Sequence, residues 1–74
     1  MRKNPFQSAV DLGAELRRLR RSLDLTQIDV ARRARTSQAS LSRVESGRPG
    51  TAPEIVARIV AVIDAAAREK GAKR

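Results

Sequence analysis

Basic side chains, most of them arginine, are the groups in this sequence best suited to binding a ligand. The 74 residues include 16 Lys and Arg against 8 Asp and Glu, which gives a net charge of +8. A surplus of this size on so short a chain favours a polyanionic partner, nucleic acid before an anionic membrane, over a merely well-solvated surface. The planar guanidinium fork also suits phosphate and guanine edges better than the point charge of lysine does.

The most common groups of acid–base and nucleophilic catalysis are missing from the sequence. It has no His and no Cys, which removes the common general bases and the most reactive nucleophile. It also contains no paired acids, no glycine-rich phosphate loop and no cluster of metal ligands. We therefore expect a protein that is not an enzyme and that uses no metal or other cofactor.

Two further absences narrow the class of partner. Phe6 is the only aromatic residue, so the chain lacks the aromatic platforms on which single-stranded nucleic acids usually stack. Double-stranded DNA is therefore the favoured polyanion. No apolar run approaches the roughly 20 residues of a membrane span, and nothing resembles a secretory signal. We expect a cytoplasmic protein that has no membrane partner.

The length of the chain bears on its oligomeric state. A single domain of 74 residues buries only about 60% of the surface that its unfolded chain exposes, so its own core is marginal. Without cysteine, neither disulfides nor thiolate metal sites can add stability. A partner subunit is the usual remaining aid, so we expect a homodimer.

Apolar periodicity and capping residues predict a long helix at each end of the domain. The first should begin at Ser8, with Asp11 as its capping partner, and should end near Leu23. Its apolar stripe is formed by leucines that are four, three and four residues apart, namely Leu12, Leu16, Leu19 and Leu23. The last helix should begin at Pro53 and reach residue 68 or beyond as one helix.

Two short helices are predicted between the long ones. Thr26 caps the second helix, about residues 27–34, and Asp29 completes a capping box. Ser37 caps the third helix, about residues 38–46, which Gly47 ends in a left-handed conformation. Asp24 tolerates the same conformation at the break after the first helix. The inner faces of the short helices carry small or branched apolar residues, namely Val30, Ala31, Ala34, Leu41 and Val44.

The stretch from Leu25 to Gly47 places polar caps, core positions and a closing E-x-G at fixed spacings. Its segments are Leu25-Thr26-Gln27, Val30-Ala31, Ser37-Gln38 and Leu41-Ser42-Arg43-Val44-Glu45-Ser46-Gly47. With these segments the chain, from about Leu12 to Ile63, resembles the Cro/lambda-repressor-like (XRE-type) helix-turn-helix family, whose pattern is L-[ST]-Q, L-A, S-x-x-x-[IL]-S-x-[IL]-E-x-G. Arg35 replaces the usual turn glycine, and Thr36 replaces the apolar residue after it. Arg35 must then accept a positive φ, at about 1 kcal/mol.

The resemblance implies an all-α fold, a compact lambda-repressor-like DNA-binding domain of four to five helices. The helix-turn-helix would comprise the second and third helices. We assign residues 8–68 to this domain, residues 1–7 to a flexible basic arm and residues 69–74 to a basic tail. The family also implies a bacterial or phage-encoded protein that is associated with the nucleoid when it is bound to DNA.

In this family the third helix enters the major groove, and its first residues meet base edges. The matching positions here are Gln38, Ala39, Ser40, Ser42 and Arg43. Gln38 suits adenine N6 and N7, Arg43 suits guanine O6 and N7, and the methyl of Ala39 suits thymine. The alternatives are that Gln38 is a solvated residue at the helix start and that Arg43 contacts phosphate or solvent only.

The same resemblance implies two further groups of residues. The DNA phosphate contacts would be Thr26, Gln27, Ser37, Ser46 and Arg48, although Arg48 could equally be solvated. Arg20 and Glu45 lie beside the apolar stripes of the first and third helices, which suggests a partly buried ion pair that joins them. The family has the same pairing, and we interpret both residues as structural.

The last helix has more apolar positions than a short domain needs. Ile55, Ile59 and Val62 share one face and should close the core of the monomer. A second strip of apolar residues lies on the adjoining face, namely Val56, Val60 and Ile63. This strip is the candidate dimer interface, with packing of both strips inside the monomer as the alternative.

The sequence therefore predicts a sequence-specific regulator of transcription that binds double-stranded DNA, a repressor that binds a palindromic operator as a homodimer. One alternative is an antitoxin-type module, whose apolar strip binds a partner toxin or another protein while the helix-turn-helix regulates its own operon. Another is a basic protein that coats DNA without reading its sequence.

Overall fold

Four helices follow the order that the sequence predicts. The computed structural model describes residues 9–72, and its helices are α1 (Ala9–Ser22), α2 (Gln27–Arg33), α3 (Gln38–Glu45) and α4 (Pro53–Ala72). No strand occurs in this range, so the predicted all-α class is confirmed. α4 is one helix of 20 residues and extends past residue 68. The predicted cap Ser8, the basic arm and the last two residues of the tail lie outside the described residues.

Local capping chemistry determines where the two short helices begin. The Thr26 hydroxyl accepts a hydrogen bond from the Asp29 N–H, and the Asp29 carboxylate accepts one from the Thr26 N–H, each at 3.0 Å. The hydrogen bond from the Thr26 backbone holds the pKa of Asp29 below its ordinary value. At the start of α3, the Ser37 hydroxyl accepts a hydrogen bond from the Ser40 N–H at 3.0 Å. Both predicted N-caps are confirmed.

Left-handed residues separate the elements where the sequence indicates breaks. Asp24 and Arg35 each have a φ of 58°, and Gly47 has a φ of 73°. Arg35 thus adopts the conformation that its place in the turn between α2 and α3 requires, although it is not glycine. The turn keeps the geometry of the motif at the expense of some backbone strain.

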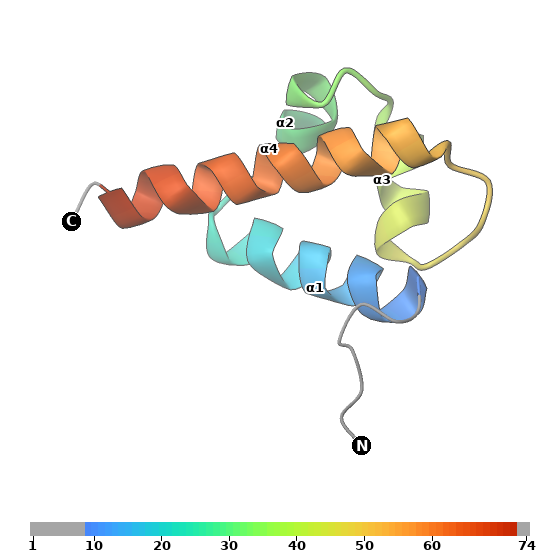
Figure 1. The fold of residues 1–74 in the computed structure, drawn as a ribbon, viewed down its shortest axis with the longest axis horizontal. Coiled ribbons are helices and arrows are strands. Elements are labelled where there is room, and N and C mark those ends of the chain that lie inside the picture. The colour runs from blue at the N-terminus through green and yellow to red at the C-terminus, as the bar shows by residue number, and fades with distance from the viewer. Residues whose placement is uncertain (1–8, 73–74) are drawn as a thin grey trace.

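The helices enclose one small core. α4 runs along α1 and α2, and its C-terminal half extends away from the end at which α3 lies (Figure 1). The core consists of Leu16, Val30, Ala31, Ala34, Leu41, Val44, Ile59 and Ile63. The other three leucines of the predicted α1 stripe are partly buried against this core. All five residues that the sequence assigns to the inner faces of α2 and α3 are buried.

The apolar face of α4 differs from the expectation at Ile63. This residue, expected in the partner-binding strip, is only 1% exposed and belongs to the monomer core. It lies one helical turn after the fully buried Ile59, so both side chains point the same way. That part of the prediction is wrong, because a side chain buried within the monomer has no surface to offer a partner. Val60 is 37% exposed, and Val56 is half-buried.

A close backbone approach sets the distance between α1 and α3. A Cβ atom on Gly13 would lie 2.3 Å from the carbonyl oxygen of Val44 and 2.7 Å from that of Glu45. Only glycine leaves room for the end of α3 at this point of α1. The sequence did not single out Gly13, because its role depends on a neighbour that is distant along the chain.

Candidate nucleic-acid interface

The predicted base-contacting residues lie mainly on the open face of α3. Gln38, Ala39, Ser42 and Arg43 are exposed, whereas Leu41 between them is buried in the core. Ser40 is half-buried, and its hydroxyl accepts a hydrogen bond from the Ser37 hydroxyl at 3.1 Å. The hydroxyl of Ser40 therefore takes part in the cap of α3.

A buried ion pair underlies this face. Arg20 and Glu45 are 8% and 7% exposed, and Arg20 Nε lies 2.6 Å from Glu45 Oε2. A second hydrogen bond joins Arg20 Nη2 to Glu45 Oε1 at 3.1 Å, and Arg20 Nη1 donates to the Leu25 carbonyl at 2.9 Å. The expected pair is thus bidentate, and it ties α1 to α3 and to the chain just before α2.

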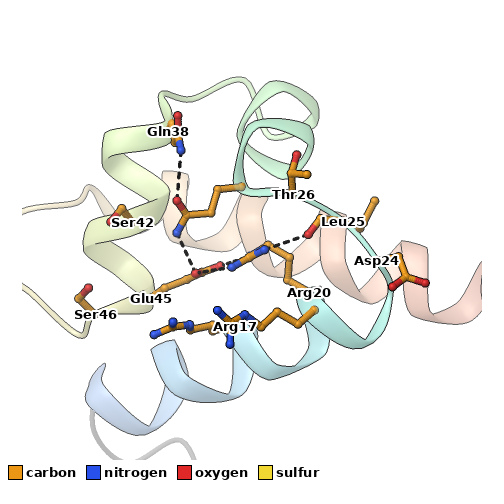
Figure 2. A pocket seen from close by; sticks show the side chains of 11 residues that line it. Arg17, Arg20, Asp24, Leu25, Thr26, Gln38, Ser42, Glu45 and Ser46 are labelled. Carbon is orange, nitrogen blue, oxygen red and sulfur yellow. Dashed lines mark hydrogen bonds and ion pairs between the residues drawn. The ribbon is translucent and has the colours of Figure 1, made fainter.

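Two glutamines continue this network to the surface. Gln27 Nε2 donates to Glu45 Oε1 at 3.0 Å, and Gln38 Nε2 donates to Gln27 Oε1 at 3.3 Å. Figure 2 shows the resulting chain from Arg20 through Glu45 and Gln27 to Gln38. An amide nitrogen has two hydrogens, so Gln38 retains one N–H and its carbonyl oxygen for another partner. These hydrogen bonds connect the buried pair to an exposed side chain of α3.

A polar hollow of about 640 Å³ borders the network. The residues that line it are Arg17, Arg20, Arg21, Asp24, Leu25, Thr26, Gln27, Gln38, Ser42, Glu45 and Ser46. The hollow thus brings together five of the predicted DNA contacts, from α2, α3 and the residues that cap them. The hollow is not lined by the other five predicted contacts, which are Ser37, Ala39, Ser40, Arg43 and Arg48.

Arg43 lies on the side of α3 that faces the following loop. A Cβ atom on Gly50 would lie 3.7 Å from both Cδ and Nη1 of Arg43, so the arginine side chain passes close to the loop backbone. Arg48, in the same loop, is exposed. Arg43 therefore lies beside the loop between α3 and α4, and neither arginine lines the hollow.

Arg58 on α4 supports the helix-turn-helix, a structural role that the sequence did not reveal. Its Nε donates to the Ala34 carbonyl at 2.9 Å, and its Nη2 donates to the Arg35 carbonyl at 3.1 Å. These bonds hold the end of α2 and the left-handed turn that leads into α3. In the sequence, only the presence of Arg35 where the family usually has glycine indicated that this turn is strained and gains from additional hydrogen bonds.

Other kinds of site receive no support from the part of the chain that the structure describes. No group of three or more acidic residues in residues 9–72 is arranged to hold a metal ion. None of the described helices is long and apolar enough to cross a membrane.

Comparison with known proteins identifies the family. The profile of a family described as helix-turn-helix domain matches residues 11–71, which include all four helices except the ends of α1 and α4. Searches of curated proteins and of solved structures found no match to the chain. The matched family belongs to the Cro/lambda-repressor-like, XRE-type group, and its domains typically bind DNA rather than catalyse reactions. The chain therefore belongs to the helix-turn-helix family of the Cro/lambda-repressor-like group.

Proposed function

We propose that this protein is a regulator of transcription that recognises a specific sequence of double-stranded DNA with the exposed face of α3. The observation that carries the proposal is the chain of hydrogen bonds from the buried Arg20–Glu45 pair to Gln38. A side chain that reads a base edge must be held in one orientation, because each free rotation weakens discrimination between bases. A Gln38 side chain that is only solvated would not need the hydrogen bond that holds it to Gln27.

Gln38 and Arg43 are the proposed readers of base identity. The carbonyl oxygen of Gln38 can accept from adenine N6, and its second N–H can donate to adenine N7 while the first stays bound to Gln27. Arg43 can donate two hydrogen bonds to guanine. The smaller contributors are Ala39, through a thymine methyl, and Ser42, with Ser40 restricted by its bond to Ser37.

Phosphate contacts from either side of α3 would fix its register in the groove. We assign this role to Thr26, Gln27, Ser37, Ser46 and Arg48. Thr26, Gln27 and Ser46 line the hollow, whereas the exposed Arg48 lies in the loop that follows α3.

The proposed active form is a homodimer on a palindromic operator, where it represses transcription. Val60 and the half-buried Val56 leave apolar surface on α4, and a core this small gains stability from a second subunit. A two-fold dimer would place two copies of α3 about 34 Å apart, one turn of DNA.

Selection from a pool of randomised DNA duplexes tests this proposal, and it does not require the operator sequence to be known. We expect the protein to enrich one motif that has two inverted half-sites about one helical turn apart. Enrichment of a single half-site would disprove the symmetric dimer, and a final pool as random as the initial one would disprove sequence recognition itself.

A further inference from the structure

We infer that α1 carries an additional binding strip for DNA phosphates, formed by Arg17 and Arg21. This inference rests on the proposed DNA-binding function and extends the interface to an element outside the helix-turn-helix. Both arginines are exposed, and both line the hollow that Gln38 and Ser42 line from α3. Figure 2 shows Arg17 on α1, below Glu45 in this view.

The two arginines are positioned to follow one strand of the DNA backbone. Residues four apart lie on the same face of a helix, about 6 Å apart along its axis. Two guanidinium groups on one face can therefore bind neighbouring phosphates of the strand that passes over the hollow. Guanidinium–phosphate hydrogen bonds are charge-assisted and do not depend on base sequence.

The charges that line the hollow favour an anionic ligand there. Arg20 is neutralised by Glu45, which leaves Arg17 and Arg21 against the single carboxylate of Asp24. Within residues 9–72, neither Arg17 nor Arg21 uses its side chain in an ion pair or hydrogen bond. An unneutralised pair of guanidinium groups beside α3 favours the binding of a polyanion.

Arg18 provides a matched comparison on the same helix. It pairs with Glu15, with Nη2 2.6 Å from Oε2 and Nε 3.0 Å from Oε1. Arg18 does not line the hollow. Replacement of Arg17, Arg18 or Arg21 by Gln removes the same charge from α1, so the three variants share any long-range electrostatic effect. They differ in position and in the pair with Glu15, which only Arg18 makes.

The test is a titration of each variant against DNA at several salt concentrations. We expect Arg17→Gln and Arg21→Gln each to weaken binding about 3- to 10-fold at 0.15 M salt and to reduce the salt slope by about 0.9. The loss should be equal for the selected duplex and for a scrambled duplex, since phosphates carry no sequence information. Arg17→Lys should restore part of the affinity, and Arg18→Gln should stay within about twofold of the wild type.

Each outcome bears on a separate claim. Equal, small losses for all three glutamine variants would overturn the strip, and so would a loss confined to the selected duplex. If the wild-type protein binds both duplexes equally, the proposed sequence recognition fails, but the strip is still tested by the salt slopes on either duplex. If the Arg17 and Arg21 variants bind DNA as tightly as the wild type but lose binding to an acidic protein, the strip belongs to an interface with a protein partner instead. Thermal unfolding of every variant serves as the control for folding.

Discussion

At the scale of the residue, one buried ion pair links the packing of the helices to the proposed recognition of DNA. Glu45 accepts hydrogen bonds from Arg20 and from Gln27. The bonds from Arg20 join α1 to α3, and the bond from Gln27 begins the chain that ends at Gln38. The pair need not add net stability, because two charges have been removed from water. Its value to the protein lies in the fixed arrangement that it imposes on the groups around it.

Removal of one member of this buried pair should cost far more stability than removal of one member of an exposed pair. Glu45→Ala leaves Arg20 buried with only the Leu25 carbonyl, and we expect a loss of about 3–5 kcal/mol in the free energy of unfolding. Urea unfolding measures this loss. Glu15→Ala, which breaks an exposed pair on α1, is the control and should leave the midpoint almost unchanged.

A double variant distinguishes the two roles of Glu45. Arg20→Met with Glu45→Met replaces the charges by apolar side chains and should recover most of the stability lost in Glu45→Ala. DNA discrimination should stay reduced, because Gln27 has lost its acceptor. If this double variant is stable and discriminates as well as the wild type, the network does not orient Gln38.

At the scale of the element, the turn between α2 and α3 shows what the sequence could and could not predict. The caps Thr26 and Ser37 followed from local chemistry, because the residues that interact are at most a few positions apart. The positive φ at Arg35 followed from the family resemblance, in which a glycine usually holds this place. Gly13 and Arg58 could not be predicted in this way, since their partners lie on other helices. Ile63 was assigned to the wrong surface because the periodicity of apolar residues reveals an apolar face of a helix, but not how much of that face the other helices cover.

The strain at Arg35 and the hydrogen bonds from Arg58 should both be measurable in the free energy of unfolding. Arg35→Gly should raise the free energy of unfolding by about 0.5–1 kcal/mol, because glycine adopts a φ of 58° without steric conflict. Arg58→Ala should lower it by about 1–2 kcal/mol through the loss of two hydrogen bonds to carbonyl groups.

Arg68→Ala is the control for Arg58→Ala. It removes an arginine from the same helix, and this arginine pairs only with the exposed Asp64, at 3.1 Å. Urea unfolding of the three variants checks the prediction. Equal effects for Arg58→Ala and Arg68→Ala would show that α4 does not support the turn.

At the scale of the whole molecule, α4 connects the fold to the expected assembly. One side of this helix fills the core with Ile59 and Ile63, and Lys70 Nζ donates to the Ser22 carbonyl at the end of α1 at 2.9 Å. The adjoining side leaves Val60 exposed. The sequence could predict that α4 has surplus apolar residues, but only the packed structure separates those that remain available to a partner from those that do not.

The proposed dimer can be tested at the exposed part of α4. Val60→Asp places a charge on this surface and should shift the protein from dimer to monomer, measured by sedimentation equilibrium. Ala61→Asp, at the next and also exposed position, is the control for the added charge. If Val60→Asp and the wild type have the same mass in solution, Val60 is not part of the interface.

The central claim is that the buried pair orients Gln38 to read a base. The most direct test is fluorescence anisotropy at about 0.15 M salt, with the wild type, Gln38→Ala and Gln27→Ala titrated against the selected duplex and a scrambled one. We predict that the wild type prefers the selected duplex by at least about 1000-fold. Gln38→Ala should lose about 1–3 kcal/mol on that duplex alone, and Gln27→Ala should lose part of the same discrimination. Equal losses on both duplexes, or full discrimination by Gln38→Ala, would contradict the account.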